Sequence, residues 1–314
     1  MASHPLAAPT VNGSGQILVE QYLKQPTRIT RMIEDLTLDR FLSDFLFSKG
    51  PKVVGGALIY DEAVGPDEAT KYLKAGDDVH EIAPSGQFPR FETSDAAAPK
   101  VAKVQKYGGE VEIAWEAKTR NDQRAFARDI TRLSNTIVRK INTVAMATLD
   151  TALAAHPSQS TTLGALGLSG WATIAAASGG IQTGMNGTFA VMKRPDALFA
   201  AVQLQADTQE MGVTYDTLLI NPIDAGRLRD IYGSDVNKVL ADSGLTLVKT
   251  TRVAAGTAYF AAKGQVGGIA LEQPLATRVY VEDRHQRDVV QSSVIPLFYV
   301  DNPTAVLKVT GLGA

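Results

Sequence analysis

The clearest pattern of apolar and polar positions lies between Asp122 and Ala155. Apolar residues recur there at steps of three and four, which places them on one stripe of a helix. The segment contains neither Gly nor Pro, and Asp122 is suited to cap its first turn. At ~1.5 Å per residue, it predicts a helix roughly 50 Å long. The stripe consists of Phe126, Ile130, Leu133, Ile137, Ile141, Val144 and Thr148 or Leu149.

A row of basic residues follows the opposite side of this predicted helix. Its members are spaced so that they fall along nearly the same face. The simplest interpretation is a solvated face, or one that is paired with acidic neighbours. The row consists of Arg120, Arg124, Arg128, Arg132 and Arg139.

The first 50 residues have no pattern of a self-contained domain. Gln16–Leu23 is weakly amphipathic, and Arg31–Phe47 ends in a cluster of Phe and Leu residues that needs a covering surface. Before them lies a polar stretch of small residues. We therefore expect residues 1–50 to form an arm that packs on another body.

Between residues 51 and 118 the pattern changes to strands around a turn-rich middle. Val53–Tyr60, Val101–Val104 and Val111–Trp115 have strand character, and Gly and Pro residues mark turns between the first two. A long two-stranded ribbon is marginally stable alone. We expect this excursion to contact neighbouring molecules.

After a Gly-, Ser-, Ala- and Thr-rich segment, Leu163–Gly187, helices and strands alternate and then strands dominate. The segment itself is predicted to be a loop or lobe boundary. The whole chain is therefore predicted to be α+β. The predicted helices are Pro195–Gln205, Ile223–Tyr232 and Asp235–Asp242; the predicted strands are Thr217–Ile220, Leu245–Val253, Thr257–Ala262, Gly268–Leu271, Thr277–Glu282, Val289–Tyr299 and Ala305–Thr310.

The composition of the chain excludes several classes of protein function. With 314 residues, the chain is long enough for two or more lobes. A net charge of −2 argues against a dedicated nucleic-acid binder. The absence of cysteine excludes disulfides, Cys-ligated metals and thiol catalysis. We find no secretory signal and no run of ~18 apolar residues that would span a membrane.

Motifs of catalysis are also missing, so we expect no enzyme activity, no cofactor and no metal. Gly167–Gly170 resembles half of a nucleophile elbow, but no strand precedes it. Carboxylates lie near His80 and near His285, where a metal site is an alternative to a solvated turn. An unrecognised α+β enzyme is therefore the remaining alternative of another class.

The order of parts, with several short stretches, resembles the major capsid protein of tailed double-stranded DNA bacteriophages, which has the HK97-type fold. The resemblance implies an N-terminal arm (1–50), an extended E-loop (51–118), a peripheral domain with a spine helix (119–162 and 276–314; spine 122–155) and an axial domain (163–275). The stretches that carry it are Glu81–Pro84, Phe88-Pro89, Lys106–Gly109, Glu112–Glu116, Leu218–Pro222, Ala276–Glu282 and Val300–Gly311.

The resemblance also implies a function. Hexamers and pentamers of the chain would tile an icosahedral shell around double-stranded DNA, in a virion assembled in the host cytoplasm. The arginine row would then face the DNA, whose phosphates bind cations without sequence preference, or lie between subunits. An encapsulin-like nanocompartment shell is the alternative.

Two departures from the family limit what the resemblance implies. Only about fifteen polar residues precede the first helical segment, so we expect scaffolding, if it is used, from a separate protein. Lys71, Lys74 and Lys100 lie in the excursion, but Asn302 lies too near the chain end for the family's Lys–Asn crosslink. We expect non-covalent cohesion, with portal and decoration proteins as further possible partners.

Overall fold

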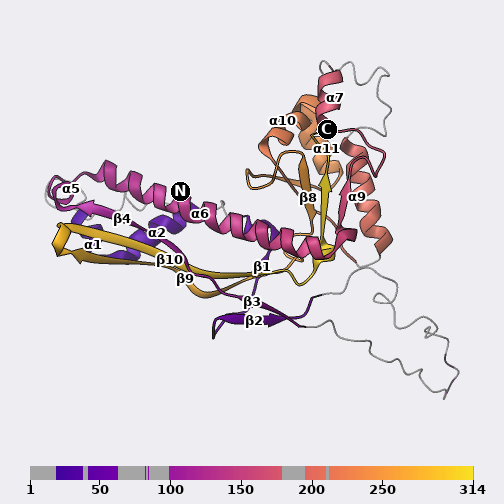
Figure 1. Ribbon diagram of the computed structural model, residues 1–314. Coiled ribbons are helices and arrows are strands. Elements are labelled where there is room, and N and C mark those ends of the chain that lie inside the picture. Colours follow the sequence, from indigo (N-terminus) through magenta and orange to yellow (C-terminus); the bar gives the residue numbers. More distant parts are fainter. Residues whose placement is uncertain are drawn as a thin grey trace.

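The computed structural model describes residues 19–37, 42–62, 82, 84, 99–178, 195–209 and 212–313. The predictions for the first 18 residues, for most of the E-loop including His80, Lys71 and Lys74, and for the end of the Leu163–Gly187 segment lie outside these ranges. Figure 1 shows an elongated body along one long helix, with a second lobe standing at one end of it.

Helix α6 (Gln123–Ala155) is the spine that the sequence predicts, and it spans 33 residues. The carboxylate of Asp122 accepts a hydrogen bond from Ala125 N at 3.0 Å, as expected of an N-cap. The predicted apolar stripe is buried, except for Val144 and Thr148, which are half-buried. The helix ends at His156, whose N–H bonds to Leu153 O.

A four-stranded sheet covers one side of α6 in the order β1-β9-β10-β4. Its two longest strands pair antiparallel as a single hairpin, whereas the sequence analysis divided the first of them in two. The ladder shifts register between Ser293 and Pro296, and this irregularity lets β9 continue past Pro274, which has no N–H to donate. The strands are β1 (Ser48–Lys49), β4 (Tyr107–Ala114), β9 (Gly268–Glu282) and β10 (Arg287–Tyr299).

The described part of the arm packs on its own subunit, so the expectation that the arm packs on another body was wrong for these residues. Val19, Tyr22, Ile29 and Ile33 are buried in the same core as the α6 stripe. The second helix begins at Pro26 rather than Arg31, since proline is well suited to a first helical turn. The arm helices are α1 (Val19–Leu23), α2 (Pro26–Thr37) and α3 (Ser43–Leu46).

Two asparagine side chains fix the path of the arm along the spine. Asn121 Oδ1 accepts a hydrogen bond from Val19 N at 2.9 Å, and Asn142 Oδ1 accepts one from Leu42 N at 3.0 Å. Asn142 is buried within the apolar side of α6. A buried amide requires a partner, so this pairing favours one position of the arm over others.

The second lobe contains a five-stranded sheet in the order β5-β11-β8-β6-β7. Helices flank it, and Phe199 of α9 packs on Phe260 of β8 with ring centroids 6.0 Å apart. Its strands are β5 (Ser160–Thr162), β6 (Thr217–Ile220), β7 (Thr246–Lys249), β8 (Thr257–Ala261) and β11 (Val306–Thr310); its helices are α7 (Trp171–Ser178), α9 (Pro195–Gln209), α10 (Pro222–Tyr232) and α11 (Val236–Asp242).

This lobe corrects two predictions. Residues 276–314 were grouped with the spine helix, but β11 pairs with β5 and β8 in the second sheet. The pattern of a strand does not specify its sheet, because the pairing partners are distant in sequence. Likewise α7 lies within the predicted loop 163–187, where Ala-rich sequence supports a helix once Trp171 and Ile174 are buried.

A polar contact joins the second lobe to the C-terminal part of the spine. Asp150 Oδ1 accepts a hydrogen bond from Tyr259 Oη at 2.6 Å and an ion pair from Lys308 Nζ at 2.7 Å. Tyr259 is buried, and burial together with the bond to Asp150 raises the pKa of its phenol far above the usual value. The phenol therefore remains a donor to this carboxylate across the physiological pH range.

We expect Asp150→Ala to lower the unfolding temperature by a few degrees, because loss of the acceptor costs about 1 kcal/mol. Asp150→Asn should lower it less, because an amide oxygen still accepts from Tyr259. Thermal unfolding followed by circular dichroism measures both, with the exposed Asp242→Ala as control. Equal unfolding temperatures for Asp150→Ala and the control would show that this joint contributes nothing.

Candidate assembly surfaces

The structure places four of the five predicted basic residues on the exposed side of α6. These are Arg124, Arg128, Arg132 and Arg139. Arg120 is also exposed but lies before α6, at the end of the short helix α5 (Trp115–Thr119). The row is therefore shorter than predicted, and the name arginine ridge is used below for the four residues on α6.

The arginine ridge is only partly neutralised. Asp129 Oδ1 lies 3.3 Å from Arg128 Nε and 3.4 Å from Arg132 Nη1. Arg124 and Arg139 form no ion pair with any residue that the structure describes. Exposed pairs of this kind contribute little to stability, so the ridge has no evident role in holding the fold together.

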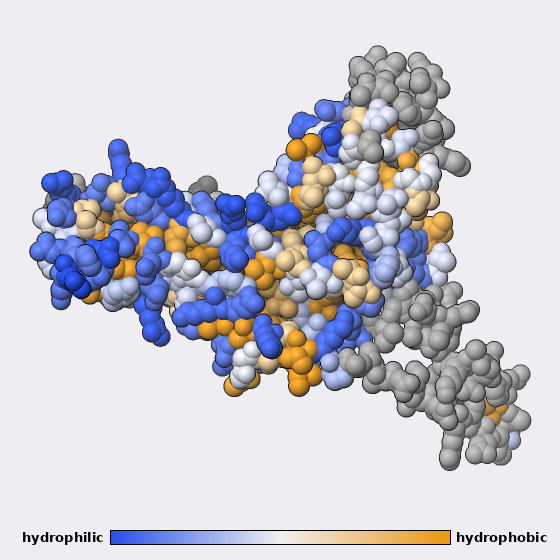
Figure 2. Space-filling model, in the orientation of Figure 1, coloured by the Kyte–Doolittle hydropathy of each residue, from blue (hydrophilic) through white to orange (hydrophobic). Residues whose placement is uncertain are grey.

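A small two-stranded hairpin, called the root hairpin below, has one buried and one exposed apolar face. It pairs β2 (Ala57–Tyr60) with β3 (Lys100–Lys103). Leu58 and Tyr60 pack inward on a small core with Leu297 and Tyr299. On the outer face the cross-strand partners Ile59 and Val101 are 70% and 57% exposed. Figure 2 shows hydrophobic residues gathered on the edge of the molecule where Figure 1 places β2 and β3.

A buried carboxylate ties this hairpin to the end of the spine. Glu62, which follows β2, forms an ion pair with Lys100 of β3. Its other oxygen lies 3.3 Å from His156 Nε2 at the C-terminal end of α6. Because a buried charge is stable only when paired, the ion pair with Lys100 stabilises Glu62 and links the end of β2 to β3, beside the C-terminal end of α6. The sequence analysis did not identify this cluster, since its members are far apart along the chain.

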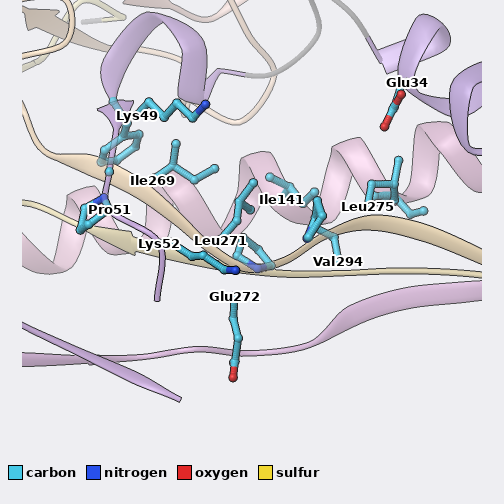
Figure 3. A pocket seen from close by; sticks show the side chains of 15 residues that line it. Glu34, Lys49, Pro51, Lys52, Ile141, Ile269, Leu271, Glu272, Leu275 and Val294 are labelled. Atoms are coloured by element: carbon cyan, nitrogen blue, oxygen red, sulfur yellow. The ribbon is translucent and has the colours of Figure 1, made fainter. Parts of the chain in front are cut away.

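An apolar groove of about 710 Å³ lies between the arm, the spine and the four-stranded sheet. Figure 3 shows aliphatic side chains of α6, β9 and β10 facing one another there, with Lys49 and Glu34 at the opposite ends. Most of its lining is apolar, as is usual where a partner segment binds. Its labelled apolar residues are Pro51, Ile141, Ile269, Leu271, Leu275 and Val294.

Carboxylates near His285 form ion pairs at the turn between β9 and β10. Glu282 contacts Arg287 Nε at 2.5 Å and His285 Nδ1 at 2.9 Å. These hydrogen bonds, chiefly the one from Arg287, lower the pKa of Glu282 below its usual value. Across the ranges that the structure describes, no three potential metal-ligating residues come together. The described residues around His285 thus form a charge-paired turn between β9 and β10.

The described helices include none that is both long and apolar enough to cross a bilayer. Four surface features stand out on the described part of the chain. They are the arginine ridge on α6, the apolar outer face of the β2–β3 hairpin, the apolar groove and the charged turn between β9 and β10.

Comparisons with known proteins agree with this architecture. Residues 97–309 match a family model described as phage capsid protein. A search of curated proteins found no match. Among solved structures, the chain is similar to a virus-like particle from Pyrococcus furiosus, with 12% identity, a TM-score of 0.58, and coverage of 90% of this chain and 98% of that one.

Two further structures share the fold. One is a phage-related protein from Bordetella bronchiseptica, with 12% identity, a TM-score of 0.57, and coverage of 91% of this chain and 96% of that one. The other is the capsid of Myoviridae phage XM1, with 13% identity, a TM-score of 0.51, and coverage of 88% and 92%. The family match extends over the spine helix and over both large sheets apart from β1, and we conclude that this chain belongs to the phage capsid protein family and has the HK97-type fold.

Proposed function

We propose that this chain is a major capsid protein that assembles as hexamers and pentamers into an icosahedral phage head enclosing double-stranded DNA. Its role is structural rather than enzymatic. The observation that carries the proposal is the exposed apolar pair Ile59 and Val101, on a hairpin face that no described element of the subunit covers. A surface of this kind is typical of a protein–protein contact.

The parts of the chain have distinct roles in this proposal. The second lobe, residues 157–266 together with β11, is the axial domain at the centre of each capsomer. The spine with the four-stranded sheet is the peripheral domain, residues 51–104 form the E-loop with its root, and residues 1–50 form the arm. Many small contacts of this kind, each weak alone, give a stable shell through multivalency.

We further propose that the arginine ridge faces the packaged DNA. Arg124 and Arg139 have no acidic partner among the described residues, and four arginines per subunit repeat over the whole shell. A separate scaffolding protein, a portal and a decoration protein are the other partners. Cohesion is non-covalent, and particles assemble in the host cytoplasm.

An encapsulin-like compartment is the second candidate, because the similarity to the Pyrococcus furiosus particle covers 98% of that chain. The cargo distinguishes the two: DNA for a phage head, protein for a compartment. Negative-stain electron microscopy of the overexpressed chain, alone and with its neighbouring genes, tests the shell itself. Closed particles or capsomer rings are expected; a monodisperse monomer under both conditions would refute the proposal.

We expect the double substitution Ile59→Lys and Val101→Lys to abolish particle formation while leaving the subunit folded. Both side chains are mostly exposed, so the fold loses little, whereas a contact between subunits would bury two charges. Sedimentation measures assembly and circular dichroism measures folding. Thr136→Lys, which adds a charge on an exposed position of α6, is the control, and normal particles from the double variant would contradict the proposed role of this face.

We expect Arg124→Gln with Arg139→Gln to weaken DNA binding and its dependence on salt. The logarithmic salt slope should fall by about 0.9 for each lost phosphate contact. Binding of a short DNA duplex to the purified assembly, measured between low and high salt, gives the slope. Arg229→Gln with Lys238→Gln, two exposed changes on the axial domain, is the matched control. An unchanged slope for the ridge variant would remove the ridge from DNA binding.

A further inference from the structure

Trp115 is the tryptophan that the folded subunit leaves partly exposed. It begins α5, and Figure 1 shows α5 at the end of the molecule opposite the axial domain. Trp115 is 37% exposed, whereas Trp171, the other tryptophan of the chain, is 1% exposed. Covering an indole ring removes a large apolar area from water, so an apolar occupant beside Trp115 would be stabilised.

A hollow of about 480 Å³ lies beside this ring. Three of its lining residues, Trp115, Lys118 and Thr119, belong to α5, and Asn121 follows that helix. The fifth is Glu20, in the first turn of the arm helix α1. The hollow therefore lies where the arm begins, between α1 and α5.

The polar side chains of this lining already have partners within the subunit. Lys118 Nζ lies 3.1 Å from Asp288 Oδ2, and Glu20 lies 2.8 Å from Lys24 Nζ. The hydroxyl of Thr119 donates a hydrogen bond to the main chain of its own helix at 2.9 Å. An occupant therefore has no unpaired charge to neutralise, and an apolar side chain suits the hollow better than an ion does.

Asn121 fixes the point at which the chain enters this hollow. Its Oδ1 accepts a hydrogen bond from Val19 N at 2.9 Å. Val19 N is bonded covalently to Leu18, so standard bond lengths place Leu18 Cα within roughly 5 to 6 Å of Asn121 Oδ1. The backbone of Leu18 therefore lies at the rim of the hollow, whatever path the preceding residues take.

The residues that reach this rim are apolar. Leu18 is preceded by Ile17, and both follow a polar stretch that ends in Gly15-Gln16. The next apolar residues of the arm already pack on the spine: Tyr22 contacts Phe126 with ring centroids 5.8 Å apart. Ile17 and Leu18 would extend this contact by one step toward Trp115, and their burial there is favourable for both surfaces.

We propose that the hollow beside Trp115 binds the chain's own N-terminal segment, with Ile17 and Leu18 packed against the indole ring. The occupant comes from the same chain because Leu18 is tethered at the rim, which gives it a far higher effective concentration than a segment of another molecule has. The segment is thus a built-in cover for Trp115, and its release opens the ring to solvent. The inference concerns one subunit and does not rest on the proposed function.

Tryptophan fluorescence of the full-length chain tests the cover. In Ile17→Ser with Leu18→Ser, the emission should shift to longer wavelength and acrylamide quenching should rise about twofold, because Trp115 loses its apolar cover. Leu6→Ser with Val11→Ser, which removes apolar side chains from the same segment, is the matched control and should change neither. The same double substitution in a Trp115→Phe background should be silent, and circular dichroism reports that each variant is folded.

The absence of cysteine allows a second, covalent test. In Leu18→Cys with Thr119→Cys, mild oxidation should link the two positions within one chain, since a disulfide requires Cα atoms about 4.4–6.8 Å apart. A non-reducing gel should then show a monomer band, and thiol titration should find no free thiol. Val11→Cys with Thr119→Cys is the control and should keep both thiols.

The outcomes distinguish this inference from the proposed function. Unchanged fluorescence in the Ile17 and Leu18 variant, or free thiols in the Leu18 and Thr119 variant, would overturn the cover. A dimer band, obtained also from a mixture of the two single cysteine variants, would assign the hollow to the segment of a second copy and overturn the contact within one chain. None of these measurements depends on particle formation, so either proposal can fail while the other stands.

Discussion

Burial of the apolar side of α6 is the interaction on which the other elements depend. At 33 residues the helix is too long for one small element to cover, so different parts of the chain pack along it. The four-stranded sheet covers one stretch and the arm helices another. Near its C-terminal end, Asp150 accepts a hydrogen bond from Tyr259 of the second lobe. The spine therefore determines where both lobes stand.

The elements that project from this spine have apolar surfaces that no described part of the subunit covers. The root hairpin buries one face on Leu297 and Tyr299 and leaves Ile59 and Val101 outside. The groove beside Leu271 and Ile141 is likewise open to solvent. A stable monomer would conceal such faces, whereas a subunit of a shell uses them, because identical neighbours are always present at high local concentration.

The charged residues differ in the same way between the interior and the surface of the subunit. The buried acids Glu62, Asp224 and Asp288 each pair with a cation of the same subunit, which stabilises their charge. The arginines of the ridge are exposed and only half neutralised. The net charge of −2 is therefore unevenly distributed: the chain is slightly acidic overall, yet the exposed side of α6 is basic.

The sequence alone determined the elements whose pattern is local. The spine, its Asp122 cap and strand 217–220 could be predicted because periodicity and capping depend on neighbouring residues. The same helical period placed Arg124, Arg128, Arg132 and Arg139 on the exposed side of α6, but not Arg120, which ends α5. Tertiary structure decided what depends on contacts between distant residues. It placed β11 in the five-stranded sheet, packed the arm on its own spine through Asn121 and Asn142, and brought Glu62 within 3.3 Å of His156. It also left Trp115 exposed and Trp171 buried, because burial is a property of the packed core rather than of the residue.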